Sequence, residues 1–522
     1  PTIGQGASAG TATLAGSCPD APDPAALPDA AKLREMNAPL AALGVRPTGS
    51  AAQNSYISWI RKQLGTVPGA QISEERFTIN RWSHGPMELQ LEAGETTTPV
   101  PVAAPVPYAQ PTTSDGVSGP VVEIPDSEAI TAANAAGRIV LRPAPAGSVP
   151  NYDFFLPVVI WLVYDPQATI DPTQTFFGDF INYNARVADL RDAAAAGAKA
   201  ILFVKELPAS QLTNHYEPYE GTPWKVPAVY LGADEGKQIA DAIASGANVR
   251  ARLVLHASYR SVETPTIRAL IGGESRQRIV VDSHTDGTNA VEDNGPIAMV
   301  AIARYLATLP SECRPRDVEF VFPTAHFFQR VVDPSKRYGG AGVIATQLDS
   351  EYEQGKVSSV LTLEHLGAID YEQMPRAAGG PGFELLPNGL RAIQFVGITP
   401  SPALVGAVTE VVQHYGMERT ILLQGADAPG STVPSHCNFG GEGTPYNVHL
   451  LPTVGEISAP QSLYDPSFGL EGIDFNVMHA ELLGFTQLLN KLGTMSQAEV
   501  AGEIPLERQE RAAGGASCPP EN

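Results

Sequence analysis

The stretch from Arg278 to Thr308 constrains the fold of this chain more than any other part of its sequence. The run Ile279–Val281 is short, apolar and β-branched, which is typical of a buried strand. A loop follows, and Asn294-Gly295-Pro296 then predicts the start of a helix, because proline is favoured at the first helical position. A buried strand joined to a helix in this way is the unit from which α/β sheets are built.

Three side chains between this strand and this helix can take part in a metal site. His284 and Asp286 occupy alternate positions, so both side chains leave the strand end on one side, and Asp293 lies just before the helix. Open α/β sheets place their ligands at the carboxyl ends of strands. The spacing predicts that His284 and Asp293 bind one divalent cation while Asp286 holds the other imidazole nitrogen. A capped strand end with solvated acids is the alternative.

Strands and helices alternate through most of the chain. In the first part, helices are expected at 30–43 and 50–64, followed by strands within 77–91. After about residue 264, strands are expected at 266–271, 278–283, 318–323, 357–363, 392–396 and 445–450, and helices at 296–308, 337–353, 401–415 and 473–492. This order predicts an α/β fold, with a mostly parallel, mixed sheet sandwiched between helices.

The pattern changes between residues 99 and 258, where proline-rich joints separate short apolar strands. We expect a small α/β domain here, inserted into a larger discontinuous domain of residues 29–98 and 259–494, with tails at 1–28 and 495–522. The run Ala193–Ile201 resembles part of a protease-associated (PA) domain. Domains of that kind bind or gate and do not catalyse.

The charge of the chain limits its partners. Lys and Arg number 34 against 56 Asp and Glu, which gives a formal net charge of −22. A strongly negative surface argues against nucleic acid and anionic lipid as partners. The sequence contains no run of eighteen or more apolar residues, so no membrane span is expected.

The four cysteines, Cys18, Cys313, Cys437 and Cys518, lack the CxxC spacing of a zinc ribbon. Cys18 and Cys518 lie in similar proline-flanked tails, and disulfides that tie the tails to the body would suit an exported protein. Three pairings are possible, and the sequence leaves them open. The chain begins at Pro1 without Met, which suggests a processed chain. We therefore expect a secreted, extracellular or periplasmic location.

Together these features resemble the zinc aminopeptidase-like metallopeptidases, which include secreted bacterial aminopeptidases, glutamate carboxypeptidase II and the non-catalytic transferrin receptor. Some members carry a PA insertion. The resemblance covers residues 30–492 and is most specific at His284-Thr285-Asp286 and at Glu292-Asp293-Asn294-Gly295. A second match is Pro434–Phe439 before Gly443-Thr444-Pro445, where the family often has Ser-Asp-His-x-x-Phe before Gly-Ile-Pro.

In that family two zinc ions share a bridging aspartate, and a Glu-Glu pair supplies the general base and one ligand. The resemblance implies that His284 binds one zinc ion, that Asp293 is the bridge, and that Glu364 is an acidic ligand of the same ion. Asp286 matches the carboxylate that supports the histidine. A solvated strand end is the alternative for Glu364. The adjacent His365 is interpreted as structural, because strand alternation turns it away from Glu364.

The chain departs from the family at the other zinc site. His326 and Phe327 stand where strand 318–322 should lead into Glu-Glu, and Gln461 stands in the place of a histidine four residues before Asp465. Phenylalanine cannot bind a cation and glutamine is a poor zinc ligand. One zinc ion with three protein ligands and an open fourth position is therefore predicted. His326 would act as general base or acid, and a satisfied histidine at an apolar edge is the alternative.

Three residues are predicted to bind substrate: His436, Phe327 and Tyr464. A tyrosine hydroxyl can donate a hydrogen bond to a developing oxyanion. Loop structure is the alternative for His436, and core packing is the alternative for Phe327.

The sequence therefore predicts an exported, metal-dependent, aminopeptidase-like hydrolase that acts on a peptide or on a small amide or ester. Three other functions stay open. The chain could be a receptor-like binding protein that lost the chemistry. It could be an enzyme that changed to another amide, an ester or a cyclisation like that of the one-zinc glutaminyl cyclases. It could also be a metal-free hydrolase that uses a serine or His326. The oligomeric state is left open.

Overall fold

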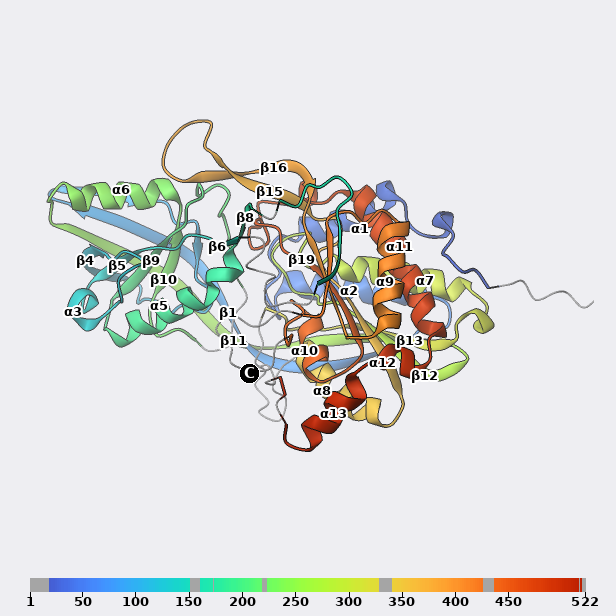
Figure 1. Cartoon of the computed structure of the whole chain (residues 1–522). Helices are drawn as coiled ribbons and strands as arrows, with labels where there is room; N and C mark the ends of the chain where they lie inside the picture. The colour runs from blue at the N-terminus through green and yellow to red at the C-terminus, as the bar shows by residue number, and fades with distance from the viewer. Residues whose placement is uncertain are drawn as a thin grey trace, which may run out of the picture.

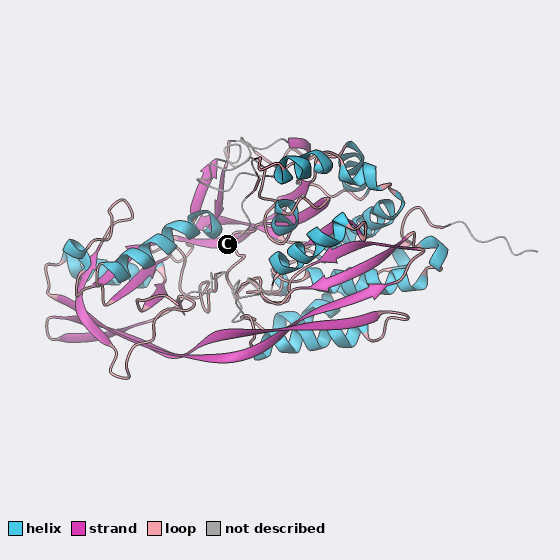
Figure 2. Cartoon of the chain, turned by 90° about the horizontal axis from the view of Figure 1, so that it is seen from below, coloured by secondary structure: helices cyan, strands magenta, loops and turns pink. Residues whose placement is uncertain are grey.

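One mixed sheet runs through the molecule, as Figures 1 and 2 show. The computed structural model describes residues 18–150, 160–171, 173–217, 223–327, 340–425, 436–515 and 517–518. The main path of the sheet follows, in order, β3 (Ala104–Pro105), β10 (Ala228–Leu231), β9 (Ala200–Val204), β5 (Ile139–Pro143), β4 (Val117–Glu123), β11 (Val249–Ile271), β13 (Arg316–Phe322), β12 (Ser275–Asp282), β14 (Val357–Leu363), β19 (Thr453–Ser458), β17 (Gln394–Ile398), β18 (Thr420–Leu423) and β7 (Ile160–Tyr164). Beside β11 lie β1 (Gln71–Ala93) and, next to it, β2 (Thr96–Val100).

Parallel strands at the centre of this sheet end at the same edge. β12 pairs in parallel with β13 on one side and with β14 on the other, and β14 pairs in parallel with β19. The carboxyl ends of neighbouring parallel strands lie together. The segments that follow β12, β13 and β14 therefore meet, and they carry His284, His326 and Glu364 respectively.

Helices cover both faces of this central region. They are α1 (Ala30–Ala42), α2 (Ala51–Leu64), α7 (Gly295–Thr308), α9 (Pro402–His414) and α11 (Phe475–Thr494) on one face, and α8 (Ala341–Glu353) and α10 (Gly443–Val448) on the other. Ile279 and Val281 of β12 belong to the first core, and Val280 belongs to the second. Successive strand residues point to opposite faces, so a doubly covered strand is apolar throughout. The expected mostly parallel sheet between two helical layers is confirmed.

The other end of the molecule contains β3, β4, β5, β9 and β10 with α3 (Ala132–Ala135), α5 (Tyr183–Ala195) and α6 (Ala233–Ala244). It has two hydrophobic cores of its own, one with Val140 and one with Ile139. β1 and β11 pair antiparallel along their length, from Gln71 opposite Leu270 to Ala93 opposite Val249. These two strands join this end to the central region (Figure 2).

Each end of the molecule sends a segment that contacts the other end. β7, from within residues 99–258, pairs antiparallel with β18 at the far edge of the central sheet. In the other direction, β15 (Ile369–Pro375) and β16 (Phe383–Arg391) form a hairpin that reaches residues before β10. Leu385 N donates to Gln211 Oε1 at 2.9 Å, and Phe383 N donates to Glu206 O at 2.8 Å. A smaller sheet pairs β6 (Gly147–Pro150) with β8 (Thr175–Gly178).

Two expected stretches differ in the structure. Residues 445–450, expected as a strand, lie in α10 and the turn after it, so that prediction is wrong. Tyr446 is completely buried with α8, and a short apolar run does not by itself distinguish a buried strand from a buried helix. Residues after Thr494, expected as a polar tail, contain α12 (Gln497–Ala501) and α13 (Ile504–Ala512). Residues 337–339, at the start of the helix expected at 337–353, lie outside the described residues.

Two disulfides tie the terminal segments to the body. Cys18 bonds Cys313, and Cys437 bonds Cys518. Residues 1–17 of the expected N-terminal tail lie outside the described residues. In the described part of the chain, no helix has the length and apolar character needed to cross a membrane.

Candidate functional site

His284, which follows β12, lies at the centre of the site and is completely buried. Its Nδ1 donates to the backbone oxygen of Asp286 at 2.7 Å. Its Nε2 lies 3.4 Å from Glu364 Oε2, and neither atom has a hydrogen-bond partner among the described residues. Buried polar atoms are nearly always paired. Two ligands at zinc distances from one tetrahedral ion lie about 3.4 Å apart, so this pair of atoms fits a shared cation.

Glu364, which follows β14, is held by the backbone of Glu442 and by the side chain of Glu456. Its Oε1 accepts from Glu442 N at 2.7 Å, and its own N donates to Glu456 Oε2 at 3.1 Å. Gly441 permits this approach, because a Cβ there would lie 2.2 Å from Glu364 Oε1. Only Oε2 remains to face His284.

His365 also turns into the site. Its backbone has a φ of 57°, in the left-handed region, so strand alternation ends at Glu364 and the expectation that His365 points away does not hold. Its Nδ1 donates to Ser458 O, and its Nε2 lies 3.3 Å from Glu292 Oε2. Ligand atoms of His284, Glu364 and His365 all lie within 4.8 Å of one another.

The carboxylates around these imidazoles attract positive charge. Burial lowers the pKa of His284, but Glu364, Glu442 and Glu292 outweigh burial and raise that pKa well above its ordinary value. The pKa of His365 is also raised, because Glu292 outweighs burial. A field that holds a proton on an imidazole also favours a divalent cation at the same place.

His326 stacks on His284, with ring centroids 4.0 Å apart. Its Nδ1 lies 2.6 Å from Glu442 Oε1. Burial and the neighbouring His284 lower the pKa of His326, but Glu442 and Glu364 raise it overall. The side chain of His326 is 21% exposed, whereas Glu442 is 2% exposed. His326 therefore lies between the buried carboxylates and solvent. Ligand atoms of His284, His326 and Glu292 form a second cluster within 4.8 Å.

The sequence predicted that the carboxylate of Asp286 holds the His284 ring. In the structure it does not. Its Oδ1 lies 3.9 Å from His284 Nδ1, beyond hydrogen-bond distance. Instead it accepts from His326 N at 3.1 Å, from Phe327 N at 2.9 Å and from Thr48 Oγ1. The backbone oxygen of Asp286 orients His284, and its carboxylate shapes the segment after β13.

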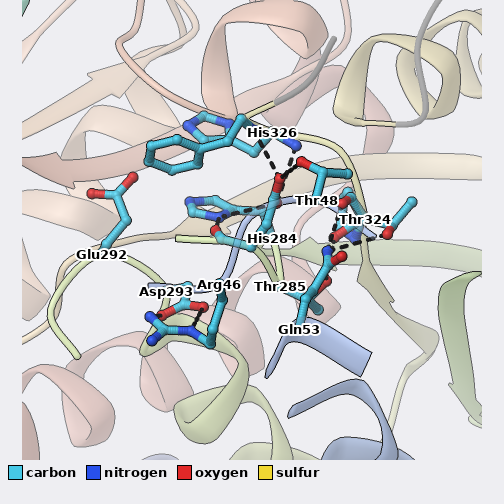
Figure 3. A network of polar contacts seen from close by, with 12 residues as sticks. Arg46, Thr48, Gln53, His284, Thr285, Glu292, Asp293, Thr324 and His326 are labelled. Atoms are coloured by element: carbon cyan, nitrogen blue, oxygen red, sulfur yellow. Dashed lines mark hydrogen bonds and ion pairs between the residues drawn. The ribbon is translucent and has the colours of Figure 1, made fainter. Parts of the chain in front are cut away.

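Asp293 is not brought together with His284 and Glu364. Figure 3 shows that Glu292 lies at the level of the imidazoles, while Asp293 turns to Arg46. The guanidinium of Arg46 holds both carboxylate oxygens of Asp293. Burial raises the pKa of Asp293 although Arg46 lowers it. Among the described residues, the oxygens of Asp293 belong to none of the clusters of candidate ligand atoms.

The three residues predicted to bind substrate lie in different surroundings. Phe327 is completely buried and packs with Tyr464 and Leu463, and Tyr216 lies beside it. His436 Nδ1 lies 3.2 Å from Gly425 O. Pro434 and Ser435, which precede it in the second sequence match, lie outside the described residues. Substrate binding by Phe327, Tyr464 and His436 stays a prediction.

Sequence reasoning did not identify the segment before and within α2, whose side chains contact the residues of the site (Figure 3). Gln53 Nε2 donates to Thr324 O at 2.6 Å and to Thr285 Oγ1 at 3.1 Å. One signal was available: Gln53 continues the buried stripe of Ile57 and Ile60 at helical spacing. A polar residue on an apolar face must find buried partners.

Comparison with family models finds no match, and none of the curated proteins matches. Solved structures do match. A zinc aminopeptidase from Bacillus subtilis is 15% identical and superposes with a TM-score of 0.58 over 92% of this chain and 99% of its own. A peptidase M28 precursor from Shewanella amazonensis is 14% identical, with a TM-score of 0.56 over 90% and 96%. An aminopeptidase from Aneurinibacillus sp. is 14% identical, with a TM-score of 0.53 over 89% and 93%. The chain therefore has the fold of the zinc aminopeptidases.

Proposed function

We propose that this protein is a metal-dependent hydrolase of amide or peptide bonds, with one zinc ion held by His284, Glu364 and His365. The observation that carries the proposal is the approach of His284 Nε2 to Glu364 Oε2 at 3.4 Å, with both atoms buried and without a partner among the described residues. The Nε2 of His365 is likewise buried without a hydrogen-bond partner there. Three nitrogen and oxygen ligands with an open fourth position are typical of catalytic zinc.

One ion rather than two is favoured by what occupies the other family positions. Phe327 offers no ligand atom and is completely buried. Gln461 Nε2 donates to Tyr371 O at 3.0 Å. Asp293, the expected bridge, is engaged by Arg46. His365 becomes the third ligand, the role that the sequence analysis assigned to Asp293.

Zinc, when bound, supplies Lewis acidity that polarises a carbonyl and makes water a stronger acid. His326 transfers the proton between water and the leaving group. His326 donates through Nδ1 to Glu442, which orients the ring. Its other nitrogen then takes a proton from water and returns one to the leaving amine. Asp286 positions His326 by accepting from its backbone N.

A location outside the reducing cytosol is part of the proposal. Disulfides persist in oxidising compartments, and the structure contains Cys18–Cys313 and Cys437–Cys518. A peptide, or a small amide or ester, is the proposed substrate.

The test is metal analysis of the purified full chain, followed by chelation and a panel of aminoacyl, peptidyl and ester chromogenic substrates. We expect one equivalent of zinc, loss of turnover on chelation, and recovery with zinc. His284→Ala should lose both metal and turnover. His479→Ala is the matched control, because His479 Nδ1 donates to Pro28 O at 2.7 Å, a contact that involves none of the proposed ligands. Full activity with near-zero metal would refute the proposal, and it would favour the metal-free hydrolase.

A binding protein without catalysis is the second candidate. It is favoured by the engagement of Asp293, an expected ligand, with Arg46, and by the buried Phe327, which stands at a position where the family has a ligand. No metal and no turnover under any condition would select it. Turnover of glutaminyl substrates with release of ammonia would instead select a cyclase.

A further inference from the structure

Arg46 and Asp293 form an ion pair in which neither side chain is exposed to solvent. Arg46 Nε donates to Asp293 Oδ2 at 2.8 Å, and Nη2 donates to Oδ1. Nη2 also donates to Asn289 O at 2.6 Å, and Nη1 donates to Gly44 O. Bidentate pairs between arginine and a carboxylate are strong and geometrically specific. Both the cation and the anion are therefore fully engaged inside the protein.

The pair joins two loops that also pair through their backbones. Arg46 N donates to Gly287 O at 2.8 Å, and Gly287 N donates to Arg46 O at 3.3 Å. A Cβ at Gly287 would lie 2.9 Å from Glu292 Cγ and 3.0 Å from Asp293 Cγ, so the loop closes tightly on itself. Tyr56 Oη donates to Asp293 O at 2.8 Å. Residues 287–294 are thus held against the segment before α2.

We propose that Arg46 is the built-in counter-ion of Asp293, and that Asp293 is a positioning residue and not a metal ligand. A guanidinium is permanently charged, so the charge of Asp293 is balanced without an ion. A divalent cation placed on the same carboxylate would lie beside a buried guanidinium, where repulsion is strong because the surroundings screen it weakly. With Asp293 held away, the neighbouring Glu292 faces His365 at 3.3 Å.

This inference rests on the proposed function, and metal affinity of the full chain tests it without an activity assay. Zinc dissociation constants are measured by competition with a chelator for the wild type, Asp293→Asn, Arg46→Met with Asp293→Asn, and Glu364→Gln. A residue that only supports ligands changes metal affinity by about tenfold to a hundredfold. We expect the two Asp293 variants to weaken binding by no more than about a hundredfold, and Glu364→Gln to weaken binding by much more than that. A loss in Asp293→Asn as large as that in Glu364→Gln would overturn the inference.

Thermal unfolding of the same chains, with Arg46→Met added, separates the two proposals. If the wild type binds no zinc, the proposed function fails, and the counter-ion is then judged by thermal midpoints alone. We expect each single variant to melt below the double variant, because removal of one partner leaves a buried charge unpaired. Losses that simply add in the double variant would overturn the counter-ion.

Discussion

Replacing Glu481 with glutamine should change how the stability of the protein depends on pH. Glu481 lies on α11 and is 1% exposed. Its Oε1 accepts from Arg391 Nη2 at 2.6 Å and from Gln394 Nε2 at 2.5 Å, and its Oε2 accepts from Gly367 N at 2.7 Å. Burial raises its pKa from 4.5 to about 7, although Arg391 lowers it. Because Gly367 lies two residues after His365, the carboxyl group of Glu481 contacts the loop that contains His365.

The size of the effect follows from that shift. The folded chain binds the proton of Glu481 more tightly than the unfolded chain, so protonation stabilises the fold. This contribution is fully present below about pH 4.5 and is lost as the pH rises through about 7. A shift of this size corresponds to about 3 kcal/mol, most of which is lost between about pH 5 and about pH 8.

The assay is urea unfolding of the wild type and Glu481→Gln across that range, in the presence of chelator. We expect the difference in unfolding free energy between the two chains to change by about 2 to 3 kcal/mol, with the wild type losing stability faster as the pH rises. Glu410→Gln is the control, because Glu410 is 59% exposed and its ion pair with Lys491 lies at the surface. Parallel pH curves for the wild type and Glu481→Gln would refute the reasoning.

Three further predictions concern residues other than the proposed metal ligands. Burial lowers the pKa of His215, but Asp465 outweighs it and the pKa rises to about 9. The resulting stability is present below about pH 6.5 and is lost as the pH rises through about 9; thermal midpoints should show this loss, and an identical loss in Asp465→Asn would contradict it. Replacing Cys437 and Cys518 with serine opens a link that spans 81 residues, which should cost about 4 kcal/mol in urea unfolding; a cost below about 1 kcal/mol would contradict the entropic argument. Phe320→Ala, at a completely buried position, should cost about 3–5 kcal/mol by the same assay, and a smaller cost would mean that the core refills the cavity.

The sequence by itself determined the sheet, the helical layers and the edge where the site lies. Ile279–Val281 is apolar on successive positions, and the structure buries both of its faces. The strand end predicted for Glu364 lies beside that of His284, because parallel neighbouring strands end together. Such patterns repeat every two or 3.6 residues, so they are visible within a short window of sequence. The disulfide pairing was not visible, because any two of four cysteines can pair.

Only the tertiary structure decided which atoms face the centre of the site. His365 enters because its backbone turns left-handed, and strand alternation cannot describe a residue beyond the strand. Asp293 leaves because Arg46, 247 positions earlier in the chain, captures both of its oxygens. Asp286 uses its backbone oxygen for His284 and its carboxylate for the segment after β13. Each of these outcomes depends on a partner brought in by folding or on a single backbone angle, and neither leaves a periodic trace in the sequence.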